Sequence, residues 1–354
     1  MPLQKDIGVI DLFCGVGGLS YGLKREGLNI IAGFDIDKTC RFAYEHNNKA
    51  KFFDTDIKQV TGDCINTLFG DSKIRILAGC APCQPFSSYA FSNKDKDPNK
   101  YDLLYQFGRL IDEVQPDIVT MENVTQITQF KLKPVLMDFV KLLEGFNYHV
   151  NVNKVYCPDY GIPQTRKRLV LIASKFGDIK LIPPTHTAEN YVTVKDVIGD
   201  LPELQAGEQS VSDPLHKAKA LSVLNLHRIR NTPYGGSWKD WPEELKLKCH
   251  KSEAGKSFGS VYGRMVWEKP APTMTTQCTG LGNGRFGHPV QNRAITVREA
   301  ALIQTFPTTY KFFSNEEIVS ITKASRYIGN AVPPKLGEII ARSILHHLSE
   351  LNKI

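Results

Sequence analysis

The stretch Ile7–Asp35, IGVIDLFCGVGGLSYGLKREGLNIIAGFD, decides the fold of this chain. Its mostly apolar start, Ile7 to Phe13, has the length and composition of a buried strand. A glycine-rich turn follows, and then a predicted helix from Leu19 to Glu26 and a second strand from Ile30 to Phe34. Strand, helix and strand in this order form the opening βαβ unit of a doubly wound sheet. The sequence therefore predicts an α/β protein.

The turn of this unit has the composition of a ligand-binding loop. Its glycines let the backbone approach a ligand closely, and Asp35 at the end of the second strand suits a ribose diol. The alternative role for Asp35 is a strand-end cap. A dinucleotide fingerprint would need glycine where Ser20 stands, so the loop disfavours a nicotinamide cofactor.

Further apolar and amphipathic segments continue the alternation up to residue 185. The predicted strands are Phe52–Ile57 (a short strand and turn), Ile74–Ala78, Ile118–Val124, Tyr148–Val155 and Leu169–Ala173, and the predicted helices are Lys38–His46, Asp102–Val114 and Leu132–Leu143. After Pro183-Pro184 the chain is rich in Gly, Pro, Lys and His with weak periodicity, which indicates a second, smaller and irregular domain. Thr296 and Glu299 are spaced for a capping box at the start of a helix. We expect Tyr327–Pro334 to open a last helix that packs on the sheet. The expected domains are therefore 1–185 plus 322–354, and 186–321.

Composition restricts the class of protein. The chain has 354 residues, 42% of them hydrophobic, and a net charge of +7, which is compatible with a polyanionic partner. Eight cysteines without a signal peptide favour a reducing, cytoplasmic compartment over a disulfide scaffold. No apolar run approaches the roughly 20 residues of a membrane span, so no membrane association is expected.

The decapeptide GCAPCQPFSS, residues 79–88, follows the predicted strand Ile74–Ala78 and contains the candidate nucleophile Cys83. A cysteine on this loop lies at the carboxyl edge of the sheet, where open α/β folds bind ligands. Pro82 and Pro85 restrict φ on either side of it. The polar, basic segment after Ser87, up to Lys100, is typical of a loop that closes over a substrate. The alternative for Cys83 is a buried structural thiol.

The hexapeptide PCQPFS, residues 82–87, resembles the nucleophile motif of the cytosine-5 DNA methyltransferases. Glu122-Asn123-Val124 is similar to the family's Glu-Asn-Val motif, and the segment from Gln164 to Arg168 is similar to its Gln-x-Arg-x-Arg motif. These and further motifs occur in the family's order from Asp11 to Pro334. The segments 271–276 and 284–289 look like the bacterial branch, so the chain is identified as a member of this family of the bacterial type II restriction-modification kind.

The resemblance implies a role for individual residues. Cys83 would add to C6 of cytosine, Glu122 and Arg166 would stabilise charge at N3 and O2, and Arg168 would help to lower the pKa of the thiol. The implied substrate-binding residues are Gln84, Ser87, Asn123 and Gln164. The implied cofactor is S-adenosyl-L-methionine, converted to S-adenosyl-L-homocysteine, without a metal. Its implied contacts are Phe13, Gly15, Gly17, Gly18, Leu19, Asp35, Ile36, Asp56, Ile57, Pro82, Asn330 and Val332.

The resemblance also implies the reaction and its partners. The expected activity is that of a DNA (cytosine-5-)-methyltransferase acting on a cytosine flipped out of a specific double-stranded DNA sequence. The expected protein is a monomer in the bacterial cytoplasm, associated with the nucleoid, and its expected counterpart is a cognate restriction endonuclease that acts on the same site.

Three alternatives remain at this point. An RNA-directed member of the family would share every catalytic residue. A metal or redox module could use Cys80-x-x-Cys83, although a tetrahedral zinc site needs two more ligands and no second Cys-x-x-Cys occurs. A non-catalytic DNA-binding scaffold would have no need to keep Cys83, Glu122 and Arg166 together.

Overall fold

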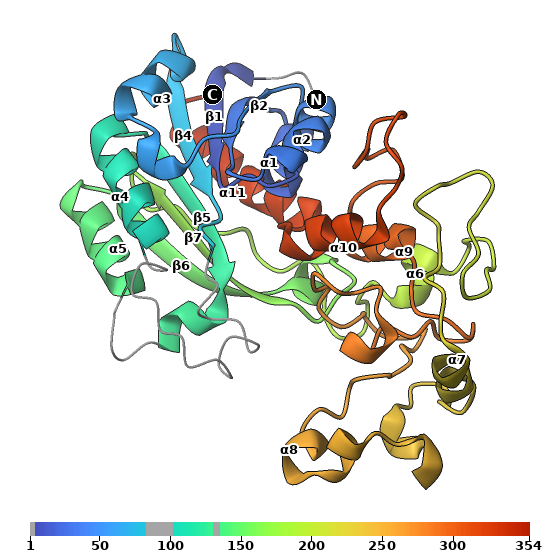
Figure 1. Cartoon of the computed structure of the whole chain (residues 1–354). Coiled ribbons are helices and arrows are strands. Elements are labelled where there is room, and N and C mark those ends of the chain that lie inside the picture. Colours follow the sequence, from blue (N-terminus) through green and yellow to red (C-terminus); the bar gives the residue numbers. More distant parts are fainter. Residues whose placement is uncertain (1–3, 83–101, 130–134) are drawn as a thin grey trace. The chain divides into compact units, whose positions relative to one another are not determined.

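A computed structural model describes residues 4–82, 102–129 and 135–354 (Figure 1). The chain divides into two compact units. The first unit comprises Met1–Tyr160, Lys167–Thr185 and Ala331–Ile354, and the second comprises Gly161–Arg166 and His186–Asn330. The expected boundary at residue 322 falls at the start of a helix that lies wholly in the second unit, and the short segment Gly161–Arg166 also belongs there.

The described residues of the first unit form a seven-stranded sheet in the order β3-β2-β1-β4-β5-β7-β6. The strands from β3 to β5 pair in parallel, whereas β7 is antiparallel to both of its neighbours. The strands are β1 (Gln4–Leu12), β2 (Leu28–Phe34), β3 (Lys51–Phe53), β4 (Ile74–Gly79), β5 (Ile118–Val124), β6 (His149–Tyr156) and β7 (Lys167–Ser174). This sheet confirms the predicted α/β class.

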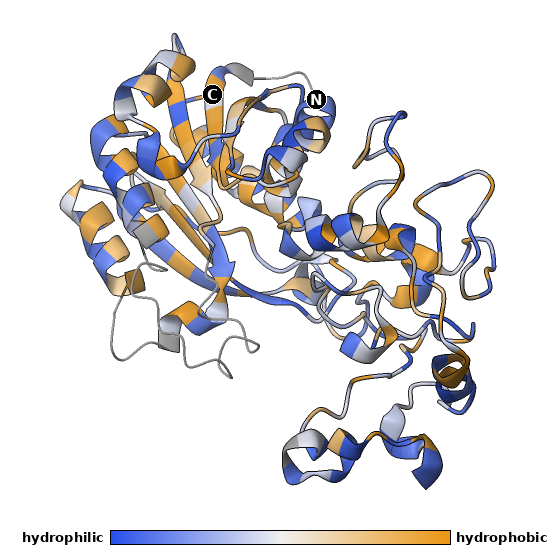
Figure 2. Cartoon of the chain, viewed as in Figure 1, coloured by the Kyte–Doolittle hydropathy of each residue, from blue (hydrophilic) through white to orange (hydrophobic). Residues whose placement is uncertain are grey.

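Helices cover the sheet in two groups. In the first group α1 lies against both α2 and α11, and in the second α4 lies against both α3 and α5 (Figure 1). The helices of the first unit are α1 (Gly18–Arg25), α2 (Arg41–Asn48), α3 (Gly62–Phe69), α4 (Asp102–Val114), α5 (Val135–Gly145) and α11 (Pro334–Glu350). Because helices pack on both sides, the central strands are mostly apolar. Leu169 to Ala173 of β7 are fully buried, and Figure 2 shows the central strands as hydrophobic.

The predicted elements of the first unit agree with the structure to within a few residues, with two exceptions. The predicted helix Lys38–His46 begins as a 3₁₀ turn, Lys38–Cys40, before α2. The prediction that Tyr327–Pro334 opens the last helix is wrong. Tyr327 lies in a separate helix, α10, which runs from Ile321 to Asn330. α11 starts only at Pro334, with Pro333 as its N-cap. The chain has to turn there because two successive prolines lack the amide hydrogens that would continue α10.

The second unit is irregular, as the composition predicted. Its described residues form isolated β-bridges and short helices rather than a sheet. Besides α10, its α-helices are α6 (Val194–Ile198), α7 (Val223–Arg230), α8 (Glu253–Lys256) and α9 (Val297–Ile303).

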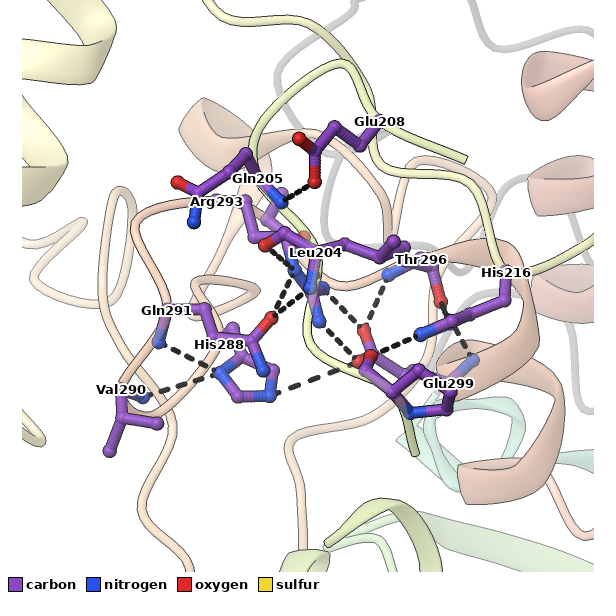
Figure 3. Close-up of polar contacts among 12 residues, drawn as sticks. Leu204, Gln205, Glu208, His216, His288, Val290, Gln291, Arg293, Thr296 and Glu299 are labelled. Atoms are coloured by element: carbon purple, nitrogen blue, oxygen red, sulfur yellow. Dashed lines mark hydrogen bonds and ion pairs between the residues drawn. The ribbon is translucent and has the colours of Figure 1, made fainter. Parts of the chain in front are cut away.

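A buried polar network holds the centre of the second unit (Figure 3). The predicted capping box of α9 is confirmed, because Thr296 Oγ1 accepts from the Glu299 amide and Glu299 Oε2 accepts from the Thr296 amide. Glu299 also forms a two-pronged ion pair with Arg293 at 2.8 and 2.7 Å, and neither side chain is exposed. Burial lowers the pKa of the neighbouring His288 to about 4, so its ring is neutral and Nδ1 accepts from the Gln291 amide.

Candidate active site

Glu122 lies at the carboxyl end of β5 with only 2% of its surface exposed. It pairs with Val170 of β7, and Arg168 pairs with Val124, so Glu122 and Arg168 are diagonal neighbours on one face of the antiparallel pair. Arg168 Nε lies 2.8 Å from Glu122 Oε1. A carboxylate in an apolar strand would be costly without such a partner. Arg168 therefore offsets the cost of burying Glu122.

The second oxygen of Glu122 is also held. Cys80 follows β4, which is parallel to β5 with Gly79 opposite Met121. Continuing this register places Cys80 beside Glu122, and the Cys80 thiol donates to Glu122 Oε2 at 3.1 Å. Glu122 is thus contacted from both neighbouring strands of the sheet. Sequence reasoning considered Cys80 only as a metal or redox ligand and missed this contact.

Two further contacts hold the turn that leads from β4 toward Cys83. The Cys80 amide donates to the Leu12 carbonyl at 3.2 Å, and the buried Asn123 side chain donates to the Ala81 carbonyl at 3.3 Å. Pro82 is exposed and is the last described residue of this turn. The predicted nucleophile Cys83, the predicted substrate contacts Gln84 and Ser87, and the expected closing loop up to Lys100 lie outside the described residues.

The glycine-rich loop after β1 has the backbone of a ligand site. Phe13 and Gly15 have φ of +59° and +51°, and Gly17, the N-cap of α1, has φ of +87°. Positive φ is unfavourable for a side chain as large as that of Phe13, and such strain clusters at functional sites. A Cβ on Gly17 would lie 2.2 Å from Asn48 Nδ2, so that position requires glycine for space as well.

Asp35 stabilises this loop directly. Its Oδ2 accepts from the Gly15 amide and its Oδ1 accepts from the Asp37 amide, each at 2.8 Å. A carboxylate oxygen can accept more than one hydrogen bond, which suits Asp35 for a ribose hydroxyl as well. Ile36 beside it is 72% exposed, which is unusual for a large apolar side chain next to a strand end. A carboxylate and an open apolar surface side by side fit the ribose and adenine of S-adenosylmethionine.

The other predicted cofactor contacts have more varied surroundings. Gly18 and Leu19 begin α1, where first-turn amides have no partner within the helix, although the Leu19 side chain is buried. Asp56 caps a 3₁₀ turn through the Lys58 amide, and Ile57 belongs to the hydrophobic core. Asn330 is exposed at the end of α10 in the second unit, whereas Val332 is buried in the first unit.

Gln164 and Arg166 both have contacts inside the second unit. The fully buried Gln164 amide donates to Gln304 Oε1 at 2.6 Å and accepts from the Met274 amide at 3.2 Å. These contacts satisfy both the donor and the acceptor of the Gln164 side chain within the protein. Arg166 Nη1 donates to the Met274 carbonyl at 3.3 Å.

A second carboxylate, which sequence reasoning did not single out, lies beneath the glycine-rich loop. Asp11 is 1% exposed on β1, and its Oδ2 accepts from Ser20 Oγ at 2.6 Å, which in turn lies 3.1 Å from the Tyr44 hydroxyl. Burial, and secondarily the charge of Asp35, raises the pKa of Asp11 to about 7. The signal was available in the sequence, since Asp11, like Glu122, interrupts an apolar strand.

The described residues include no cluster of three or more His, Cys, Asp or Glu side chains placed to bind a metal ion. Over the same residues, each helix is too short or too polar to cross a membrane.

Comparisons with known proteins agree with this geometry. A family model described as C-5 cytosine-specific DNA methylase matches residues 7–346. The type II methylase M.HgiDII of Herpetosiphon aurantiacus is 53% identical over 345 residues, which cover 98% of this chain and 97% of that protein. The type II methyltransferase M1.HphI of Haemophilus parahaemolyticus is 30% identical, over 95% of this chain and 86% of that protein.

A solved structure shares the fold over nearly the whole chain. It is a putative DNA modification methyltransferase encoded within a prophage of E. coli, with a TM-score of 0.75 and 25% identity over 97% of this chain and 99% of that one. The nicotinamide alternative and the metal module are thereby excluded as descriptions of the fold. The chain belongs to the C-5 cytosine-specific DNA methylase family and is a DNA (cytosine-5-)-methyltransferase.

Proposed function

We propose that this enzyme methylates C5 of a cytosine flipped out of a specific duplex DNA sequence, through a covalent adduct between Cys83 and C6. One observation carries the proposal: Glu122 is buried at the end of β5 and contacted by Arg168 and Cys80, beside the turn that leads to Cys83. A buried carboxyl group placed in this way can bind the polar edge of a base.

The chemistry explains why a nucleophile is needed. C5 of cytosine is a weak nucleophile, and addition of the Cys83 thiolate at C6 makes C5 electron-rich. When bound, S-adenosylmethionine supplies an electrophilic methyl group. C5 would take up that methyl group as the donor's sulfur–methyl bond breaks, which leaves S-adenosylhomocysteine. The C5 proton would then be lost to water, and its electron pair would restore the ring double bond and expel the Cys83 thiolate from C6.

The protein's other groups stabilise this adduct. Addition at C6 places negative charge on N3 and O2, where Glu122 and Arg166 would hydrogen-bond. Loss of one such contact typically costs roughly 3–4 kcal/mol of the barrier. Arg168 has a different role in this proposal: because its charge is paired with Glu122, it stabilises the buried carboxylate more than it activates the thiol.

The residues at the ends of β1 and β2 would hold the methyl donor. Asp35 would bind the ribose hydroxyls and Ile36 would cover the adenine. The glycine-rich loop would pass close to the amino-acid portion. Asp56, Asn330 and the remaining predicted contacts stay proposals on the strength of the family motif.

The target base must leave the helix before it can react, at a cost of a few kcal/mol. Lysines and arginines of the second unit would supply the salt-dependent contacts to phosphates. The proposed biological role is protection of host DNA from a cognate restriction endonuclease, because the curated relatives named above are type II methylases.

A covalent trap tests the mechanism. Duplex DNA with 5-fluorocytosine at the target, together with S-adenosylmethionine, should yield an adduct that survives denaturation and maps to Cys83, because fluorine at C5 cannot leave as a proton does. The target itself is located first by mapping 5-methylcytosine on plasmid DNA from cells that express the protein. Transfer of radioactive methyl to tRNA instead of duplex DNA would indicate the RNA-directed alternative.

Substitution of the nucleophile provides the first quantitative prediction. Cys83→Ala should lower methyl transfer by roughly 10⁴-fold or more while duplex binding stays within a few-fold, because the thiol acts in the reaction rather than in docking. Cys64→Ala is the matched control, since Cys64 is an exposed cysteine of α3. Loss of binding in parallel with activity would show that Cys83 is structural.

A further inference from the structure

Cys80 is the one hydrogen-bond donor to the Glu122 side chain among the described residues. Its thiol lies 3.1 Å from Oε2. On the other side, Arg168 approaches Oε1 to 2.8 Å as an ion pair, yet Oε1 has no hydrogen-bond partner in the described part of the chain. An ion pair is only weakly directional, whereas a hydrogen bond depends on angle. The thiol is therefore the contact that can set the rotation of the carboxyl group.

Cys80 is itself held in place. Its amide donates to the Leu12 carbonyl of β1, so β1 fixes its backbone. The next residue, Ala81, is tied to β5 through Asn123. Neighbouring strands on both sides thus determine where the thiol points, and its reach to Glu122 follows from the parallel register of β4 and β5.

We propose that Cys80 is a positioning residue for methyl transfer, which orients the Glu122 carboxyl group toward the target base through Oε2. This inference rests on the proposed role of Glu122 in the reaction. A thiol is a weak donor. The weak hydrogen bond from the thiol can orient the Glu122 carboxyl group before the base binds. The same bond can break at little cost when the base forms its own hydrogen bonds with Glu122.

The alternative is that Cys80 only fills space, and a matched set of variants separates the two roles. Cys80→Ser keeps a donor but is smaller, whereas Cys80→Val keeps approximately the volume and has no donor. Cys80→Ala is a second donor-free variant in case the branched valine disturbs the turn. Each variant is first compared with the wild type by its thermal unfolding midpoint.

The measurement is the single-turnover rate of methyl transfer at saturating duplex DNA and S-adenosylmethionine. We expect Cys80→Val and Cys80→Ala to be slower by about 10-fold, equivalent to about 1.4 kcal/mol of barrier. Cys80→Ser should stay within about 3-fold of the wild type. KM for both substrates should change by less than about 3-fold in all three variants, because orientation of Glu122 affects the reaction more than docking.

A double-mutant cycle tests whether Cys80 acts through Glu122. In a Glu122→Gln background, adding Cys80→Val should slow the reaction by less than about 2-fold, since the partner carboxylate is already gone. Equal impairment of the serine and valine variants, wild-type rates in the valine and alanine variants, or full additivity in the cycle would each overturn the inference. The fluorocytosine trap on the wild type is independent of these outcomes: an adduct there, with no effect of Cys80→Val, removes the positioning role and leaves the proposed function intact.

Discussion

At the scale of single residues, two buried carboxyl groups lie near the carboxyl ends of β1 and β5, the strands on either side of β4, but differ in their surroundings. Glu122 has a cation at 2.8 Å, whereas Asp11 has hydroxyl groups nearby and the negative charge of Asp35. The Oδ1 atom of Asp11 has no hydrogen-bond partner among the described residues. Ionising a carboxyl group in such a place is costly, so Asp11 holds its proton up to a pH of about 7. This difference has a consequence for stability.

Asp11 should make the protein less stable as pH rises. Its pKa is raised from 3.8 to about 7 in the folded state, so the folded protein binds this proton more tightly than the unfolded chain does. Stability from this group is full below pH 4 and is lost as pH rises through 7, by at most about 4 kcal/mol. Asp11→Asn stays neutral, so its free energy of unfolding relative to the wild type should rise between pH 5 and pH 8.

Urea unfolding of the cofactor-free protein at several pH values checks this expectation. Asp71→Asn is the control, because Asp71 is exposed, and its curve should run parallel to that of the wild type. Parallel curves for Asp11→Asn would mean that the buried carboxylate is ionised and stabilised in the fold.

At the scale of elements, the contact between α1 and α11 depends on glycine. A Cβ on Gly22 would lie 2.0 Å from the Pro334 carbonyl oxygen and 2.7 Å from Gly337 Cα, and a Cβ on Gly337 would lie 2.7 Å from the Leu19 carbonyl. The two helix backbones therefore touch where both lack side chains. This contact joins residues more than 300 positions apart in the chain.

Gly22→Ala should destabilise the protein although it raises helix propensity. The gain in propensity is about 1 kcal/mol, whereas forcing a methyl group against backbone atoms costs more, so we expect a net loss of about 2 kcal/mol or more. Gly145→Ala in α5 is the control: a Cβ there meets nothing within 4 Å, so it should be neutral or stabilising. The free energy of unfolding of each variant, measured in urea, tests this expectation. A Gly22→Ala protein as stable as the wild type would show that the helices move apart at little cost.

At the scale of the whole molecule, the first unit is assembled from both ends of the chain. All of its described strands come from residues before 185. The C-terminal helix α11 belongs to the same unit and packs against α1. The apolar stripe of α11 is at most 2% exposed and consists of Leu336, Ile339, Ile340, Ile344 and Leu348. Burial of five such side chains contributes on the order of 10 kcal/mol, which is comparable to the entire stability of a typical domain.

Deletion of Ala331–Ile354 should therefore abolish cooperative folding of the first unit. We expect loss of a sigmoidal thermal transition by circular dichroism, because the faces that α11 covers would be exposed. Deletion of only the last four residues, which lie beyond α11 and are exposed, is the control and should be tolerated. A cooperative transition in the longer deletion would show that the remaining elements form a stable core without α11.

Local sequence patterns were sufficient to predict many of the strands and helices of this protein and its family. The apolar runs that form β1, β4, β5 and β7, the capping box of α9 and the motifs that identified the family all lie within short stretches of chain, where spacing alone determines which side chains share a face. Asp11 interrupts an apolar strand as Glu122 does, and only its surroundings in the fold could show that its pKa is raised. The boundary between α10 and α11 was missed although two prolines marked it.

The sequence by itself thus determined the α/β class, the family and the candidate residues. Only the tertiary structure decided which strands are neighbours and that α11 packs against α1 in the first unit. It also decided that Cys80 and Arg168 contact the two oxygens of the Glu122 carboxylate, although they lie 42 and 46 residues away in the sequence. The physical reason is that the periodicity of apolar residues depends only on nearby positions in the chain. The partners of a side chain depend instead on strand order, register and close packing among segments far apart in sequence.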